Sequence, residues 1–174
     1  MLAVFTTGLL TGAVLSATVL WLFSGLFTPL PAGWRYGLLP AAALLAVARD
    51  AGLLRIRLPQ NARQIPQDVL QRHLFRGSWQ FGFELGTGVR TYVSASLPYV
   101  LALAVLLSGG GIWPALLAGT GFAAGRALTP VLRLASGDAA DWDARLAGRL
   151  TALTVGAAAA GALILAAVAG QILR

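Results

Sequence analysis

Long runs of apolar residues dominate this sequence of 174 residues and limit what it can fold into. A helix needs about 20 mostly apolar residues to cross a hydrocarbon core of roughly 30 Å, and inside that core every backbone amide must be hydrogen-bonded by the protein itself. Hydrophobic residues make up 57% of the chain and charged residues 11%, against about 25% charged residues in soluble domains. We therefore expect an all-α, polytopic integral membrane protein that forms a single transmembrane domain over residues 1–174.

About five segments are long and apolar enough to be transmembrane helices. They run from Leu2 to Phe27, from Pro31 to about Ala48, within Gln80 to Leu107, from Ile112 to Leu134, and from about Leu150 to Leu173. No Lys or Arg precedes the first run, and that run is long, so we expect it to stay in the protein and not to be cleaved as a signal peptide.

The distribution of arginine predicts the orientation of these helices, because short loops rich in positive charge stay in the cytoplasm. The segment from residue 49 to 76 holds six arginines, whereas the connection from Ser108 to Pro114 holds no charge and the next one holds Arg133, Arg145 and Arg149. All 13 basic residues are arginine, which is typical of a GC-rich bacterial genome. We expect a bacterial cytoplasmic membrane protein with its amino terminus inside and Arg174 outside.

The arginine-rich segment, residues 55–79, allows two interpretations. A short helix from Gln67 to Arg76 would gather Val69, Leu70, Leu74 and Phe75 on one side and would lie on the inner membrane face, with its arginines among anionic lipid headgroups. Alternatively, the segment is a solvated loop whose charges only set the orientation. With a net charge of +7 on so apolar a chain, we expect the partner to be the lipid bilayer and not nucleic acid.

Two further patterns predict local structure. Asp138, Asp141 and Asp143 precede Arg145 and Arg149, an order typical of a helix start, where carboxylates accept amide hydrogen bonds. The glycine at the sixth position and the distal glutamate of a calcium-binding EF-hand loop are both missing from this stretch. The stretches "TGFAAG" from residue 120 and "GAAAAG" from residue 156 bring small residues together, so we expect both to be helix-packing faces.

The composition also limits the chemistry. The chain has no Cys, which excludes thiol redox chemistry and thiolate metal sites. His73 is the only histidine, whereas a catalytic zinc site needs three protein ligands. We expect no metal, no cofactor and no enzymatic activity.

The third apolar segment carries the polar residues of most interest. On one continuous helix, Glu84, Thr87, Thr91, Ser94 and Pro98 follow each other at three- or four-residue steps and would share one face. Gly86 and Gly88 would let another helix approach closely. Pro98 removes a backbone donor, so we expect this third helix to be kinked or broken near Ser94, which is a device that transporters use to expose backbone groups to a solute.

Ionised groups gather in the cytoplasmic half of the predicted bundle: Arg49, Asp50, Glu84, Arg90 and Arg126. Two hypotheses account for them. In the functional one, Arg90 and Arg126 hold an anionic group while Glu84 balances charge or exchanges a proton. In the structural one, the arginines reach the inner headgroups and a salt bridge from Glu84 to Arg126 locks two helices together.

The stretch from Gly88 to Pro98, "GVRTYVSASLP", resembles the helix opening of the CcdA/DsbD-type thiol-electron transporters and their LysE-like exporter relatives, in which Gly and Thr or Ser precede Ser-Pro-Cys-x-x-Pro. This chain keeps Ser94 and Pro98, but Ala95 and Ser96 stand where the family has its Pro-Cys pair. Electron transfer cannot carry over without cysteine. What the resemblance implies is a kinked helix that faces a substrate.

These observations favour a small transporter or permease-like protein that moves a small, anionic solute and works as an oligomer, because five helices enclose little room. Its predicted solute-binding residues are Glu84, Arg90, Thr91, Ser94, Pro98 and Arg126. The alternative is a membrane scaffold, or an accessory subunit that binds other proteins of a membrane complex.

Overall fold

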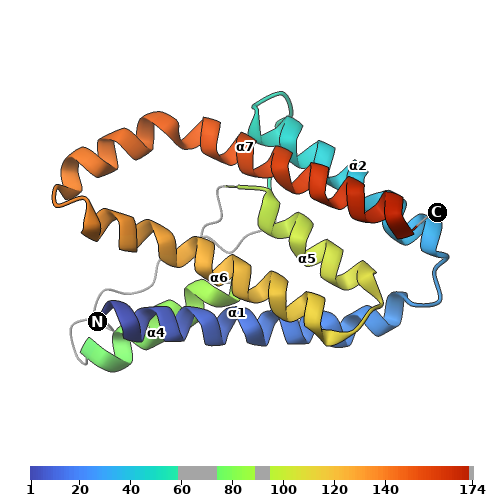
Figure 1. Cartoon of the computed structure of the whole chain (residues 1–174), viewed down its shortest axis with the longest axis horizontal. Coiled ribbons are helices and arrows are strands. Elements are labelled where there is room, and N and C mark those ends of the chain that lie inside the picture. Colours follow the sequence, from blue (N-terminus) through green and yellow to red (C-terminus); the bar gives the residue numbers. More distant parts are fainter. Residues whose placement is uncertain (59–73, 89–94, 173–174) are drawn as a thin grey trace. The chain divides into compact units, whose positions relative to one another are not determined.

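The structure, a computed structural model, describes residues 1–58, 74–88 and 95–172, and this part of the chain is built from helices without strands (Figure 1). The helices are α1 (Leu2–Ser24), a 3₁₀ turn (Gly25–Phe27), α2 (Ala32–Asp50), α4 (Leu74–Thr87), α5 (Leu97–Ser108), α6 (Ile112–Ala135) and α7 (Ala139–Ile172). The predicted all-α class is confirmed. The predicted amphipathic helix at the inner membrane face falls mostly on residues 59–73, outside the described residues.

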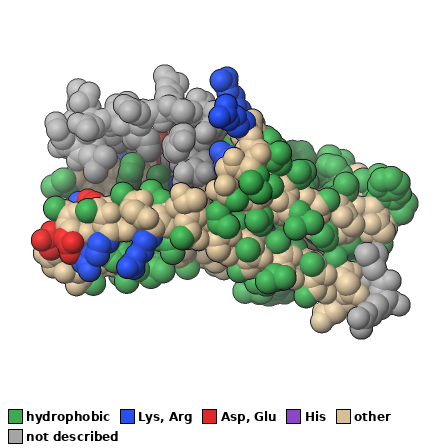
Figure 2. Space-filling model, turned by 90° about the horizontal axis from the view of Figure 1, so that it is seen from above, with side chains coloured by type: hydrophobic (Ala, Val, Ile, Leu, Met, Phe, Trp, Pro, Cys, Tyr) green, Lys and Arg blue, Asp and Glu red, His purple; other side chains and the backbone are tan. Residues whose placement is uncertain are grey.

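Three segments of the described chain are long and apolar enough to cross a membrane: Leu2–Phe27, Ile112–Ala135 and Ala139–Ile172. Helix α5, Leu97–Ser108, is apolar but shorter. The first and fourth predicted spans therefore agree with the structure, whereas the count of five is not confirmed. Large apolar side chains such as Leu117, Leu163 and Trp113 are more than 70% exposed, and apolar side chains cover much of the face seen in Figure 2. Such a surface suits contact with lipid.

The third predicted span is interrupted. Helix α4 ends at Thr87, and Gly88 follows with φ of +68°, a left-handed conformation that glycine adopts without steric cost and that commonly ends helices. The next described helix, α5, begins at Leu97, with Pro98 in its first turn. Proline suits this position because its missing N–H would have no intrahelical acceptor there anyway. Pro98 therefore starts a helix and does not kink a continuous one.

The described chain forms two compact units. Unit 1 consists of Met1–Val19, Pro59–Val93 and Ile112–Asp143, and so contains most of α1 together with α4 and α6. Unit 2 consists of Leu20–Leu58, Ser94–Gly111 and Ala144–Arg174, and so contains α2, α5 and most of α7. The interruption after Thr87 separates a helix of unit 1 from a helix of unit 2.

In unit 1, α1 and α4 are joined through a seam of four glycines, Gly8 and Gly12 on α1 and Gly82 and Gly86 on α4. A β-carbon added to any of them would overlap a backbone carbonyl oxygen of the other helix. On α1, Gly8 would meet the carbonyl of Trp79 and Gly12 that of Phe83. On α4, Gly82 would meet the carbonyl of Phe5 and Gly86 that of Leu9. The contacts advance along both helices together, so α1 and α4 run parallel. Glycines four residues apart allow this backbone contact, the arrangement known from GxxxG pairs of membrane helices.

Helix α6 contacts α1 through its own row of small residues. Ala115, Gly119, Ala123 and Ala127 are buried at four-residue intervals, and a β-carbon added to Gly119 would lie 2.8 Å from that of Ala17. The prediction that "TGFAAG" is a packing face is confirmed at Ala123, which packs against Leu9 and Ala13, but not at its two glycines, because Gly121 and Gly125 have open space around them. Those two glycines lie on α6 about half a turn away from the buried row.

In unit 2, α2 and α5 are antiparallel neighbours. Ala43, Ala46 and Val100 form a buried cluster, against which Ala162 and Leu165 of α7 pack. Of the "GAAAAG" stretch, Gly156 contacts nothing, whereas a β-carbon at Gly161 would meet the side chain of Leu97. The predicted packing face is therefore confirmed at Gly161 and at Ala158, which is buried, but not at Gly156.

Helix α7 begins at Ala139, before the predicted start at Leu150. Asp138 precedes it, and its Oδ1 accepts hydrogen bonds from the amides of Ala140 and Asp141 at 3.0 Å each. The predicted helix start at these aspartates is confirmed. Asp143, one turn further, forms a two-bond salt bridge with Arg133 of α6, with both bonds at 2.8 Å.

Candidate functional site

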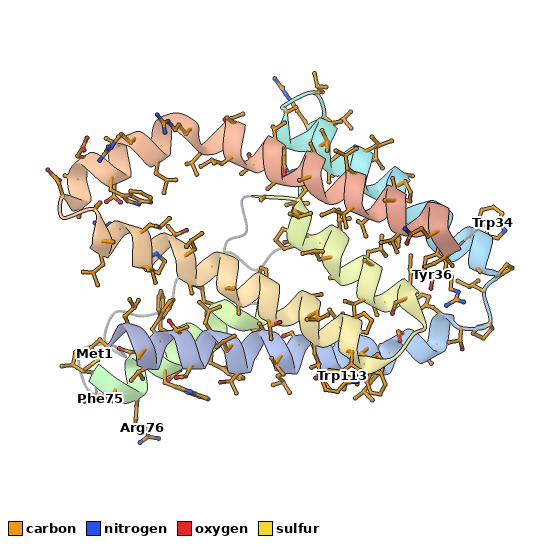
Figure 3. The ribbon with its side chains drawn as sticks, viewed as in Figure 1. Met1, Trp34, Tyr36, Phe75, Arg76 and Trp113 are labelled. Atoms are coloured by element: carbon orange, nitrogen blue, oxygen red, sulfur yellow. The ribbon has the colours of Figure 1, made fainter. Side chains whose placement is uncertain are left out.

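A stripe of polar side chains runs along α4. Its members, Arg76, Gln80, Glu84 and Thr87, are separated by four, four and three residues and therefore share one face of the helix. Within the stripe, Gln80 Nε2 donates to Glu84 Oε1 at 3.1 Å. Arg76 and Gln80 are exposed, and Glu84 is half-buried. The labelled side chain of Arg76 points outward from the end of unit 1 that also holds Met1 and Phe75 (Figure 3).

The glycine seam decides which way this stripe faces. At about 100° per residue, Glu84 lies about 200° around α4 from Gly82, so the stripe is turned away from α1. The seam also fixes the position of the stripe along α1, because Gly82 and Gly86 contact Phe5 and Leu9, inside the apolar span Leu2–Phe27. Helix α4 thus carries ionised and amide side chains beside a membrane-spanning helix, on the face opposite that helix.

Arg126 of α6 holds the carboxyl end of α4. Its Nη1 donates to the carbonyl oxygen of Leu85 at 2.7 Å, and its guanidinium lies 5.3 Å from the centre of the Phe122 ring. Leu85 is in the last turn of α4, where carbonyl groups lack intrahelical donors and the helix dipole favours a positive charge. Arg126 therefore adds a charged donor to the Leu85 carbonyl, which also accepts from the Gly88 amide at 3.3 Å.

A second charged cluster, Arg49–Asp50–Ser96, lies at the amino end of α5 in unit 2. The Asp50 carboxylate accepts from the Ser96 amide at 2.9 Å and from the Ser96 hydroxyl at 2.7 Å, and Arg49 Nη1 lies 2.8 Å from Asp50 Oδ1. The side chain of Asp50 is 1% exposed and that of Arg49 21%. Asp50, from α2, thus supplies the amino-terminal cap of α5, because the Ser96 side chain makes no cap bond of its own.

The carboxyl end of α5 is held by cationic and phenolic groups from the other end of α2. Arg35 Nη1 lies 3.4 Å from the carbonyl oxygens of Leu107 and Ser108, and the Tyr36 hydroxyl donates to Ser108 O at 2.8 Å (Figure 3). Each end of α5 therefore meets the sign of charge that its dipole favours, anionic at the start and cationic at the end.

The structure places the predicted site residues in different surroundings. Glu84 and Arg126 both belong to unit 1, and Arg126 donates to the carbonyl oxygen of Leu85, the chain neighbour of Glu84. Pro98 belongs to unit 2, in the first turn of α5. The other three predicted residues, Arg90, Thr91 and Ser94, lie outside the described residues. Of the stripe predicted from Glu84 to Pro98, the structure therefore describes Glu84 and Thr87 on α4 and Pro98 on α5.

Three polar residues of the α4 stripe and of the Asp50 cluster, Arg76, Gln80 and Ser96, were not among the predicted site residues. Arg76 and Gln80 extend the stripe toward the start of α4, and their four-residue spacing to Glu84 is a signal that could have found them. Ser96 has no such signal, because its partner comes from another helix. Among residues 1–58, 74–88 and 95–172, no group of three or more His, Asp or Glu side chains is placed to hold a metal ion.

Comparison with known proteins gives one informative match. No protein-family model matches the chain, and no solved structure matches it. The methylamine utilization protein MauF of Methylorubrum extorquens is 35% identical to it over 125 residues, which cover 70% of this chain and 43% of the relative. The chain thus spans less than half the length of this relative.

Proposed function

We propose that this chain is a transporter-like membrane protein and that the polar stripe of α4 lines the route of a small, charged solute. The observation that carries the proposal is the position of the stripe, which lies beside the α1 span yet faces away from it. An ionised side chain facing lipid at the centre of a bilayer costs about 2.5–3.5 kcal/mol on insertion scales, so such residues usually face a bundle interior or water.

The interrupted helix supports the same function. At 1.5 Å per residue, the 14 residues of α4 and the 12 residues of α5 extend about 21 Å and 18 Å, each shorter than a bilayer core. We propose that the two together make one crossing, and that α1, α2, α6 and α7 make the other four. Half-helices that end inside the membrane bring polar helix ends to mid-depth, which is how many transporters build solute sites.

The relative suggests which solutes to test first. Its name refers to methylamine utilization, and we propose that this chain serves the same process in a cytoplasmic membrane of bacterial type. Methylammonium is then the first candidate solute. Inorganic phosphate is the second, because the α4 stripe also contains Arg76 and because Arg126 binds the carbonyl of Leu85, next to Glu84 in the chain.

A flux measurement tests the proposal. The purified chain would be reconstituted in liposomes, and the entry of radiolabelled methylammonium and phosphate would be followed. We expect one of the two to enter faster than into empty liposomes, and Glu84→Gln to abolish that difference. Asp141→Asn, which removes a carboxylate from the start of α7, should leave flux unchanged. Equal rates with and without protein, for both solutes, would refute transport.

A second function has its own support. Arg35, Asp50 and Arg126 all bind helix ends, as expected if these charges only stabilise the helices that they contact. On this reading the chain is an accessory subunit of a membrane complex. The same flux experiment separates the two functions, because an accessory subunit would move neither solute and Glu84→Gln would then change stability alone.

A further inference from the structure

A hollow of about 470 Å³ lies in unit 1, apart from the polar stripe of α4. It is bounded by the first residues of α1, the start of α4, the last turns of α6 and the α6–α7 connection. Its lining residues include Leu2, Phe5, Phe81, Pro130 and Leu134, together with Ser78 and Arg133. The wall is mainly apolar, and its volume falls in the range of about 300–1,000 Å³ that is typical of small-molecule sites.

The packing of α6 explains the hollow. Near Gly119, α6 touches α1 so closely that an added β-carbon would lie 2.9 Å from the Ala13 carbonyl oxygen. Toward the amino end of α1 the two helices diverge, as Figure 1 shows. Pro130 lies inside α6 on this diverging part, and proline bends a helix because it lacks a backbone donor and its ring crowds the preceding turn.

The position of the hollow indicates its surroundings. Its apolar part lies between two candidate membrane spans, Leu2–Phe27 and Ile112–Ala135. Its rim lies at the connection between α6 and α7, which carries Asp138 and is flanked by the exposed salt bridge from Arg133 of α6 to Asp143 of α7. An apolar wedge that opens at a charged rim has the same order of polarity as a phospholipid, from acyl chain to headgroup.

Arg133 gives this rim a preference for one headgroup class. Asp143 binds its Nε and Nη2, both at 2.8 Å, and so fixes the guanidinium while Nη1 projects from the opposite side. Arginine matches the geometry of phosphate oxygens, and an arginine near the membrane surface is attracted to anionic headgroups. We propose that the hollow binds one anionic phospholipid, with an acyl chain against Phe5 and Phe81 and the phosphate at Arg133.

Native mass spectrometry of the purified chain tests this site, with equal amounts of phosphatidylglycerol and phosphatidylethanolamine as probes. We expect one phosphatidylglycerol to be retained about five-fold more than phosphatidylethanolamine, the factor that corresponds to about 1 kcal/mol. Arg133→Gln should remove this preference. Asp143→Asn should strengthen it, because it removes a competing negative charge, whereas simple loss of structure would weaken it.

A filling variant tests the location. Ser78→Phe should occupy the hollow and reduce the retention of both lipids, while Leu117→Phe, on the exposed face of α6, should leave retention unchanged. Circular dichroism and elution volume would show that the variants are folded. Three results would each overturn the site: equal retention by wild type and Ser78→Phe, an unchanged preference in Arg133→Gln, or a weaker preference in folded Asp143→Asn.

Discussion

The Asp50 carboxylate is expected to contribute more to stability than any other acidic group described here. In Asp50→Ala, the Ser96 amide and hydroxyl lose their acceptor and Arg49 loses its counter-charge. Removing one partner of a buried ion pair costs about 3–5 kcal/mol, and losing a helix cap about 0.5–2 kcal/mol. Because the Arg49 side chain is 21% exposed, we expect Asp50→Ala to lower the free energy of unfolding by about 3–4 kcal/mol.

Asp50→Asn separates the charge from the cap. An asparagine carbonyl can still accept the Ser96 amide, so this variant should lose only the charge-assisted share, about 1–2 kcal/mol. Asp143→Ala is the matched control, since Asp143 also lies 2.8 Å from an arginine but is 53% exposed. We expect no measurable change in its unfolding midpoint, because solvent screens exposed pairs.

The free energy of unfolding would be measured in mixed micelles by titration with a denaturing detergent, followed by circular dichroism. The double variant Arg49→Gln with Asp50→Asn should lose less stability than the sum of the losses in the two single variants, because both charges belong to one interaction. A free energy of unfolding for Asp50→Ala within about 0.5 kcal/mol of the wild-type value, as is usual for surface substitutions, would show that the Asp50 cap does not stabilise α5.

Two more substitutions test unit 1 in the same assay. Gly12→Leu should lower the free energy of unfolding by about 3 kcal/mol or more, because the leucine side chain would meet the Phe83 carbonyl and the backbone cannot move aside as a side chain can. Gly121→Leu is the control and should be tolerated, because Gly121 has open space around it. Equal losses of stability in the two variants would contradict the glycine seam. Arg126→Gln should lose about 1.5–3 kcal/mol with its bond to the Leu85 carbonyl, and Arg126→Lys should recover part of it. Wild-type stability in Arg126→Gln would show that α4 needs no cap from α6.

The apolar spans were predictable from sequence because hydrocarbon imposes a length on them. The helices α1 and α6 begin and end within a few residues of the expected bounds, since a long and mostly apolar run defines each of them. The start of α7 was placed too late, because its first turns are amphipathic and carry Asp141 and Asp143. The break between α4 and α5 was expected from Pro98, but the residue that ends α4 is Gly88, whose left-handed conformation only the structure reveals.

Tertiary pairing was not predictable in the same way. Gly8 and Gly12, Gly82 and Gly86, and Gly121 and Gly125 show the same four-residue spacing, yet only the first two pairs face each other. The neighbouring sequence does not distinguish these three pairs, because whether a glycine pair is a contact depends on which helices pack together. The same holds for the charged residues. The sequence indicated that Arg49, Asp50 and Arg126 need partners, but it did not indicate that these partners would be helix ends.

The most direct test of the central claim measures water access along α4. The chain contains no cysteine, so single cysteines can be introduced without removing any native thiol. Gln80→Cys and Thr87→Cys would be placed in the stripe and Leu117→Cys on the exposed face of α6, and each protein in liposomes would be treated with a charged maleimide. The account predicts rapid labelling at both stripe positions and none at Leu117→Cys. Stripe positions as unreactive as Leu117→Cys would contradict it.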